Sequence, residues 1–343
     1  APYDLYSSNY EKGLALYSKG IFIQEKCKEL VPDFLKFVRG LVDSEDFPLN
    51  ISREMLQKSP LMSKIESSLE KKILDKLISL QKNDKERYKK FFKLYGNYLK
   101  YGIYSTYGMK KNDLQDLLIF STLQSEEPIS FKDYVAKMKG GQKDIYYASG
   151  KNMDEIKMLP QLEKFKKEGI DVLLCDQEID EFALMALMDY DKHPFKNIAS
   201  EDKDSLTQEE KDKLDAVTAE NKRILDDMKE ALKGKVDEVA FSSKLVDSPV
   251  CITTKEGLSM NAERVLDEQP DAEGSQKPKA TKVLEINADH PLFQAISKLQ
   301  DEEEIKKCGN LLYDEALLLE GFEVEDKKAF VDNLNSLMMK AFH

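Results

Sequence analysis

Apolar residues in the first hundred positions change their spacing twice. Residues 14–23 are mostly aliphatic or aromatic around Gly20, a pattern that favours one extended, buried strand with a kink at the glycine. Residues 41–49 contain Asp, Ser and Pro, which is typical of a loop. From Leu61 to Leu80 apolar residues recur every three or four positions, so we predict a long amphipathic helix there.

Helical and extended patterns alternate between residues 130 and 200. Short helices are expected at 130–139 and 162–167, and short strands at 144–148 and 170–175. This alternation predicts a small α/β unit that ends near residue 200.

The remainder of the chain mixes long helices with short strands. Residues 205–234 predict one long, highly charged helix that ends at Gly234. Further elements are strands at 236–241, 250–254 and 281–286, a helical piece between the last two strands, and helices that begin near Pro291, Glu303 and Glu325. The Pro, Gly, Ser and Lys content of residues 270–280 predicts mobility. The predicted fold class is therefore α/β (α+β) and multidomain.

The last two predicted helices each carry an apolar stripe at spacings of three, four and seven. The first stripe contains Ile305, Cys308, Leu311, Leu312 and Leu319, and the second contains Phe330, Leu334, Leu337 and Ala341, with Val331 and Met338 beside it. A stripe of this kind needs a partner surface. A helical hairpin could bury both stripes against its own domain, or a second copy of the chain could cover them.

The length and charge of the chain disfavour two classes of protein, nucleic-acid-binding proteins and membrane-spanning proteins. A chain of 343 residues predicts two or three domains. Its 52 basic and 64 acidic residues give a net charge of −12, which disfavours nucleic acid as a partner. No apolar run approaches the roughly 18 residues of a membrane span, so no membrane insertion is expected.

One segment departs from this acidic balance. Residues 58–100 contain 12 basic and 5 acidic side chains. They form either a solvated helix face or a docking patch for acidic partners. Aromatic residues between Tyr88 and Tyr107 are expected to pack between helices rather than to stack on bases.

The sequence offers few candidates for self-contained chemistry. The four cysteines and three histidines are scattered, so we expect no metal site, buried free thiols and a reducing, cytoplasmic setting. No phosphate-binding loop or nucleophile motif is present. The start, Ala1 to Asp4, has no methionine and no leader, so we expect a piece of a longer protein.

A long string carries a family resemblance. Residues 37–57, FVRGLVDSEDFPLNISREMLQ, closely resemble the middle-domain signature of the ninety-kilodalton heat-shock chaperone family. Further similar segments are 1–6, 13–17, 131–135, 138–141, 145–147, 180–182, 284–287 and 290–292. The resemblance therefore extends along the whole chain and favours the bacterial type, because the end, Met338 to His343, lacks the acidic tail of eukaryotic cytosolic members.

The resemblance implies an architecture. Residues 1–125 would hold a truncated αβα large middle subdomain plus a helical connector, 126–200 a small αβα subdomain, and 201–343 a C-terminal α/β dimerisation domain. The family's N-terminal ATPase domain, which holds ATP and Mg, would be absent from this chain. No cofactor is then expected in the chain itself.

The same resemblance assigns roles to two residues near a predicted helix start. Arg53 and Gln57 are spaced i, i+4 and project from one face, and Arg53 offers forked donors suited to phosphate oxygens. In the family, the matching Arg and Gln reach the γ-phosphate of ATP bound in the nucleotide domain. Without the family, an Arg at a helix start is most often a surface ion-pair residue.

Two apolar segments are candidates for contact with client proteins. Leu258, Met260, Val265 and Leu266 form a short amphipathic stretch that resembles the family's exposed C-terminal-domain helix, although core packing is the alternative. The other segment, Phe182 to Met188, contains Met185 and Met188, and burial in the small subdomain is favoured for it.

The resemblance implies a function for the whole protein. We expect the middle and C-terminal portion of an ATP-dependent, homodimeric chaperone that binds unfolded or partly folded clients and co-chaperones in the cytoplasm, as part of the stress response. The dimer interface would contain Ile305, Leu311, Leu312, Leu334, Leu337 and Met338. The alternative is a dimeric scaffold or adaptor protein without a nucleotide cycle. On either interpretation this chain alone is not expected to hydrolyse ATP.

Overall fold

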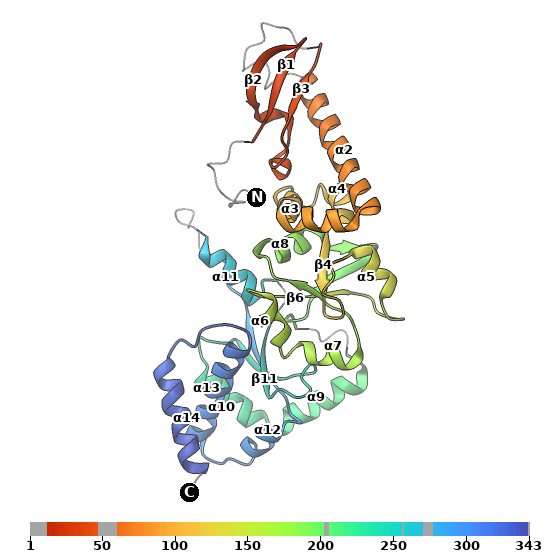
Figure 1. The fold of residues 1–343 in the computed structure, drawn as a ribbon. Coiled ribbons are helices and arrows are strands. Elements are labelled where there is room, and N and C mark those ends of the chain that lie inside the picture. Colours follow the sequence, from red (N-terminus) through yellow and green to blue (C-terminus); the bar gives the residue numbers. More distant parts are fainter. Residues whose placement is uncertain (1–11, 47–59, 202–205, 256, 270–276, 342–343) are drawn as a thin grey trace. The chain divides into compact units, whose positions relative to one another are not determined.

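A computed structural model describes residues 12–46, 60–201, 206–255, 257–269 and 277–341. The described chain is mixed α/β with three sheets, which confirms the predicted fold class at this level (Figure 1). It divides into two compact units. Unit 1 contains Ala1–Phe120, Glu127–Lys137 and Phe182–Lys192, and unit 2 contains Ser121–Glu126, Met138–Glu181 and His193–His343. The three-domain division proposed above remains a prediction.

Unit 1 begins with a three-stranded sheet. Strands β1 (Leu14–Ser18) and β2 (Ile21–Cys27) are antiparallel, and β1 is parallel to β3 (Leu41–Asp43). The prediction of one kinked strand is wrong, because Lys19 and Gly20, with φ of 52° and 75°, form a two-residue hairpin turn. The prediction that residues 41–49 are a loop is also wrong for β3, which pairs with β1 despite its Asp.

Two long helices follow in unit 1. Helix α2 (Pro60–Asn83) confirms the amphipathic prediction and buries Met62, Leu74 and Leu77. Asp84 separates it from α3 (Lys85–Ser105), since its side chain accepts a hydrogen bond from the Arg87 N–H and caps the second helix. The aromatic residues of α3 pack against one another and against Phe37, which lies between η2 (Asp33–Leu35) and β3.

The shorter elements of unit 1 lie in three separate stretches of sequence. They are η1 (Lys28–Leu30), α4 (Lys111–Leu114), η3 (Gln115–Leu117), β5 (Ile129–Ser130), α5 (Phe131–Lys137), most of α8 (Glu178–Leu187) and β8 (Asp189–Tyr190).

In unit 2, the end of β4 (Ile119–Thr122) begins a mixed sheet. Strand β4 is antiparallel to β7 (Leu173–Cys175), which is parallel to β6 (Ile145–Ser149), and β6 is parallel to β9 (His193–Asn197). Helices α6 (Met153–Met158) and α7 (Leu162–Glu168) contribute to the core of this part. The predicted alternation of helices and strands is confirmed.

The second sheet of unit 2 has the order β10-β12-β11. Its strands are β10 (Glu238–Phe241), β12 (Lys282–Ile286) and β11 (Val250–Thr254), all within one or two residues of prediction. The helices are α9 (Gln208–Glu220), α10 (Lys222–Ala231), α11 (Met260–Glu268), α12 (Pro291–Ile296), α13 (Glu302–Leu319) and α14 (Lys327–Ala341). The single helix expected over 205–234 is wrong, because the chain leaves the helical conformation at Asn221. Most of the predicted mobile segment 270–280 lies outside the described residues.

No helix in the part of the chain that the structure describes combines the length and the apolar character that crossing a bilayer requires.

Candidate functional site

The residues predicted to contact ATP cannot be placed. Arg53 and Gln57 both fall within 47–59, which lies outside the described residues. Their contact with a γ-phosphate therefore stays a prediction.

Helix α13 lies in the core of unit 2. Ile305 and Leu312 are 0% and 3% exposed and pack in a cluster that also contains strands β11 and β12. Leu311 is only half-buried. Two of the three interface residues predicted on this helix are therefore already covered within the same chain, and their assignment to a dimer interface stays a prediction.

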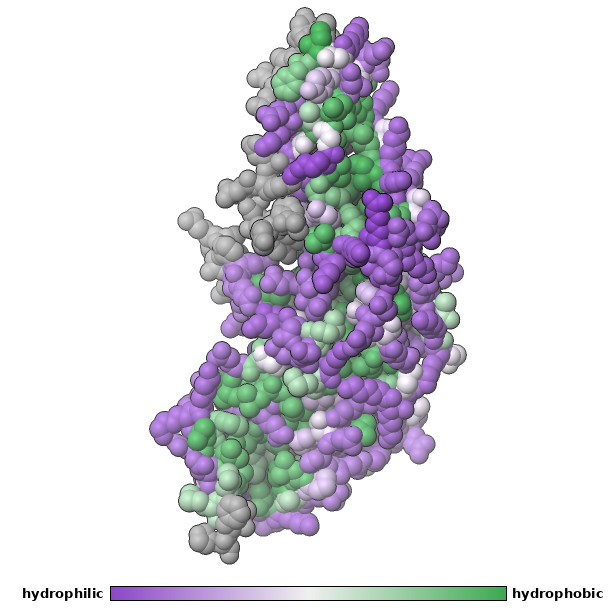
Figure 2. Space-filling model, in the orientation of Figure 1, coloured by the Kyte–Doolittle hydropathy of each residue, from purple (hydrophilic) through white to green (hydrophobic). Residues whose placement is uncertain are grey.

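Helix α14 has the opposite character. Leu334 and Leu337 are each 42% exposed, and Met338 is 48% exposed. Val331 and Met339 are exposed as well, and apolar surface gathers over α13 and α14 in the space-filling view (Figure 2). We call Val331, Leu334, Leu337, Met338 and Met339 the α14 face. Apolar residues that cluster on one exposed helix face mark an interaction surface.

Helix α11 carries the residues predicted to bind clients. Its N-cap is Ser259, whose hydroxyl oxygen accepts a hydrogen bond from the Ala262 N–H. Met260 and Val265 are 8% and 2% exposed, so the exposure expected of them is wrong: this face of α11 packs into unit 2. Leu258 and Leu266 are half-buried and keep part of their surface in solvent.

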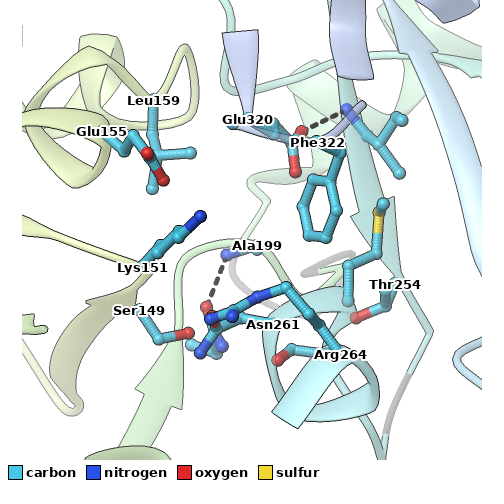
Figure 3. Close-up of a pocket in the computed structure, with 16 residues that line it drawn as sticks. Ser149, Lys151, Glu155, Leu159, Ala199, Thr254, Asn261, Arg264, Glu320 and Phe322 are labelled. Atoms are coloured by element: carbon cyan, nitrogen blue, oxygen red, sulfur yellow. Dashed lines mark hydrogen bonds between the residues drawn. The ribbon is translucent and has the colours of Figure 1, made fainter. Parts of the chain in front are cut away.

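The buried side of α11 faces a small cavity in unit 2 (Figure 3). Lys151, Glu155 and Ser149 line one side, and Arg264 and Phe322 line the other. The cavity measures about 30 Å³, which is room for one or two water molecules and far below the ~300 Å³ of a small-molecule pocket. The cavity is therefore a water-sized polar space between neighbouring elements rather than a cofactor site.

Two carboxylates beside this cavity, those of Glu181 and Glu320, accept hydrogen bonds from several neighbouring elements. Glu181 is 2% exposed and accepts hydrogen bonds from the Ser149 hydroxyl, the Asn197 amide and the Ser259 hydroxyl, each at 2.8 Å. Glu320, the C-cap of α13, accepts hydrogen bonds from the Ile252 N–H at 2.7 Å and the Gln161 amide at 2.8 Å.

Burial changes the proton affinity of two groups near this cavity, Glu320 and Tyr147. Burial raises the pKa of Glu320 to about 8, although its two hydrogen bonds act in the other direction. Burial and the nearby Glu181 also raise the pKa of Tyr147 well above its usual value. Burial is the largest cause of both shifts.

An exposed apolar cluster in unit 1 was only partly anticipated. Met185 in α8 and Met188 directly after it are 43% and 71% exposed, so burial is wrong for these two, although Leu184 and Leu187 are buried. Tyr107 is 88% exposed, so the expectation that the aromatic residues up to Tyr107 pack between helices is wrong for it. Met109, which is 80% exposed, carries no sequence signal that separates it from a core methionine. A β-carbon on Gly108 would lie 2.5 Å from the carbonyl oxygen of Ala186, so the turn that carries Tyr107 and Met109 packs directly on α8.

Metal and thiol chemistry find little support among the described residues. No group of three or more His, Cys, Asp or Glu in these ranges is placed to hold a metal ion. Cys27, Cys175 and Cys251 are free and buried, as predicted, whereas Cys308 is half-buried. Burial raises the pKa of Cys251 well above its usual value, which disfavours a reactive thiolate.

Comparison with known proteins connects these features. A family model described as Hsp90 protein matches residues 1–343. The chaperone protein HtpG of Clostridium acetobutylicum is 44% identical over 340 residues, which is 98% of this chain and 54% of the relative. HtpG of Oceanobacillus iheyensis is 40% identical over 341 residues, covering 99% of this chain and 54% of the relative. HtpG of Bacillus subtilis is 41% identical over 340 residues, with 98% and 54% covered.

This chain spans about half the length of the curated relatives that it matches. The family model, however, extends over every residue of the chain. The chain therefore belongs to the Hsp90 family.

Proposed function

We propose that this chain is the middle and C-terminal portion of a homodimeric Hsp90 chaperone that binds partly folded proteins. Family membership and the span of about half the relatives' length support this reading. The single observation that carries it is the α14 face, whose Leu334, Leu337 and Met338 stand exposed next to the end of the described chain.

The α14 face is suited to a two-fold contact with a second copy of the chain. In a two-fold interface each apolar residue meets the same surface on the partner, so one helix stripe is sufficient to complete the contact. Helix α13 packs against α14. Helix α13 is itself fixed in the core of unit 2 by its buried Ile305 and Leu312. We therefore propose that α14 supplies the exposed layer of the interface and that α13 positions it.

The experiment that tests this proposal is the double variant Leu334→Glu and Leu337→Glu. Each substitution places charge in the interface twice, so the dimer should dissociate about a thousandfold more readily and light scattering should report monomers. Ala329→Glu is the matched control, since it adds charge at an exposed position of the same helix that helical periodicity places on the side opposite Leu334 and Met338, and it should leave the dimer intact. A double variant that dimerises as tightly as the unmodified chain would place the interface elsewhere.

We propose that clients contact apolar side chains that solvent already reaches. In unit 1 these are Tyr107, Met109, Met185 and Met188, and in unit 2 they are the half-buried Leu258 and Leu266. Methionine side chains are flexible and polarisable, so they adapt to many partner surfaces. The buried Met260 and Val265 would then support α11 rather than touch a client.

Arg53 and Gln57 would act on nucleotide bound by a domain outside residues 1–343. A positioned Arg stabilises charge on the transferred phosphoryl group, an effect of roughly 10³ to 10⁵ in rate for arginine fingers. In a longer protein that contains the nucleotide domain, Arg53→Ala should slow ATP turnover by orders of magnitude while nucleotide affinity stays nearly constant. If the longer protein is instead a scaffold without a nucleotide cycle, it should show no ATP hydrolysis, and Arg53→Ala should have no effect on it.

A further inference from the structure

The loop between β10 and β11 directs three consecutive backbone N–H groups at one carboxylate. Glu163, in the first turn of α7, accepts hydrogen bonds through Oε2 from the N–H groups of Val246 at 2.7 Å and Asp247 at 2.8 Å. The Ser248 N–H lies 3.1 Å from each carboxylate oxygen, and the Ser248 hydroxyl donates to Oε1. Successive N–H groups that converge in this way form a concave anion-binding nest.

A second residue shapes the same loop from its own side. Asn287, which directly follows β12 and is 6% exposed, donates its side-chain amide to the carbonyl oxygens of Val246 at 3.2 Å and Ser248 at 3.1 Å. The Asn287 N–H donates to the carbonyl oxygen of Pro249 at 2.9 Å. These bonds use only residues of the 206–341 part, so they hold the loop without any contribution from Glu163.

Two other polar contacts between the 138–201 and 206–341 parts of unit 2 involve buried residues. Lys244, which is 6% exposed, donates to the carbonyl oxygen of Ile198 at 2.9 Å and to that of Ser200. Thr254 donates its N–H to the carbonyl oxygen of Ala199 at 2.8 Å. The nest differs because two of its three residues, Val246 and Asp247, are exposed to solvent.

We propose that residues 246–248 form a preformed anion-binding nest and that Glu163 is the latch that closes it, fixing the 138–201 part of unit 2 to the 206–341 part. The ligand class is a carboxylate or a comparable small oxyanion, and Glu163 fills the nest from within the chain. Consistent with this geometry, the hydrogen bonds from Ser248, Val246 and Asp247 keep the pKa of Glu163 below its usual value although burial alone would raise it. Opening the latch would release the 246–248 loop from α7, while the bonds of Lys244 and Thr254 would still join the two parts.

Hydrogen–deuterium exchange on the complete chain tests the latch. In Glu163→Ala the amides of 246–248 should exchange about ten- to a hundredfold faster, because each loses a charged acceptor. Exchange at Thr254 and Glu201, whose amides bridge the two parts, should rise less, and the amides within β6 and β12 should keep their protection. Glu168→Ala is the matched control, since it removes an exposed Glu from the end of the same helix.

Chemical rescue tests whether the nest is preformed. Acetate added to Glu163→Ala should restore protection at 246–248, whereas chloride at the same ionic strength should not. Neither salt should change the unmodified chain, because its nest is already filled. Protection that acetate fails to restore would overturn the preformed nest.

Two outcomes would overturn the latch itself. One is an unchanged rate of amide exchange at 246–248 in Glu163→Ala. The other is a rate at 246–248 that rises as much in Glu168→Ala as in Glu163→Ala. If Glu163→Ala does not fold, Ser248→Ala is the second variant. It removes only the hydroxyl donor, so it should raise exchange at 246–248 by a smaller factor, and no change there would also contradict the proposal.

Discussion

Helices α13 and α14 carry similar apolar stripes but have opposite surroundings. In α13, Ile305 and Leu312 are almost completely buried within the chain, whereas in α14, Leu334 and Leu337 keep 42% of their surface exposed. Both stripes follow the three, four and seven spacing of an amphipathic helix. Apolar periodicity therefore shows that a helix face must be covered. Only the packing shows whether the same chain covers that face.

The largest expected effect separates the two helices by stability. Leu312→Ala should lower the free energy of unfolding of unit 2 by about 2 to 5 kcal/mol, because it leaves a cavity in the core. Leu334→Ala should change it by less than about 0.5 kcal/mol at concentrations where the chain is monomeric. Denaturant unfolding of both variants measures the difference. Equal losses would mean that α14 is as much a core helix as α13.

Helix α11 repeats the contrast on a smaller scale. Met260→Ala should destabilise unit 2 by about 2 to 4 kcal/mol, because Met260 belongs to its main apolar cluster. Leu258→Ala should cost about 1 kcal/mol or less, since Leu258 is only half-buried. Thermal unfolding monitored by circular dichroism measures the loss of stability in each of the two variants. A smaller loss for Met260→Ala than for Leu258→Ala would return α11 to the exposed role predicted from sequence.

The Glu320 carboxyl group at the end of α13 should make stability depend on pH. The pKa of Glu320 is raised to about 8 in the folded chain from a usual 4.5, so the folded state holds a proton that the unfolded state has lost. This contribution is complete below about pH 4.5 and is lost as the pH rises towards about 8.

Glu320→Gln should remove that dependence and make the variant more stable than the unmodified chain above about pH 8. Unfolding free energies measured across this range provide the check. Parallel pH profiles for the two proteins would show that the Glu320 carboxylate remains hydrated and ionised.

The smallest expected effect concerns the exposed methionines of unit 1. Met109→Ser with Met188→Ser should weaken capture of an unfolded client several-fold without lowering the melting temperature, because both side chains are exposed. Met158→Ser is the matched control, since Met158 is an equally exposed methionine in unit 2. Fluorescence anisotropy with a labelled unfolded protein measures capture, and an equal loss in the control would argue against a specific surface.

The sequence by itself determined the helices and strands whose patterns are local. The stretch of α2, the α/β alternation around β6 and β7, and the three strands β10, β11 and β12 all follow from hydrophobic spacing. The family could also be identified from the motif at 37–57, because a long string of specific residues is more informative than any single one.

Tertiary structure decided the features that depend on distant residues. The pairing of β3 with β1 joins residues about 26 positions apart, and the burial of Met260 needs a core assembled from several other elements. Glu163 lies 83 to 85 positions from the amides that it accepts hydrogen bonds from, so no local pattern could reveal the nest. Local spacing fixes which face of an element is apolar, but burial and hydrogen bonding are set by the chain segments that fold against that face.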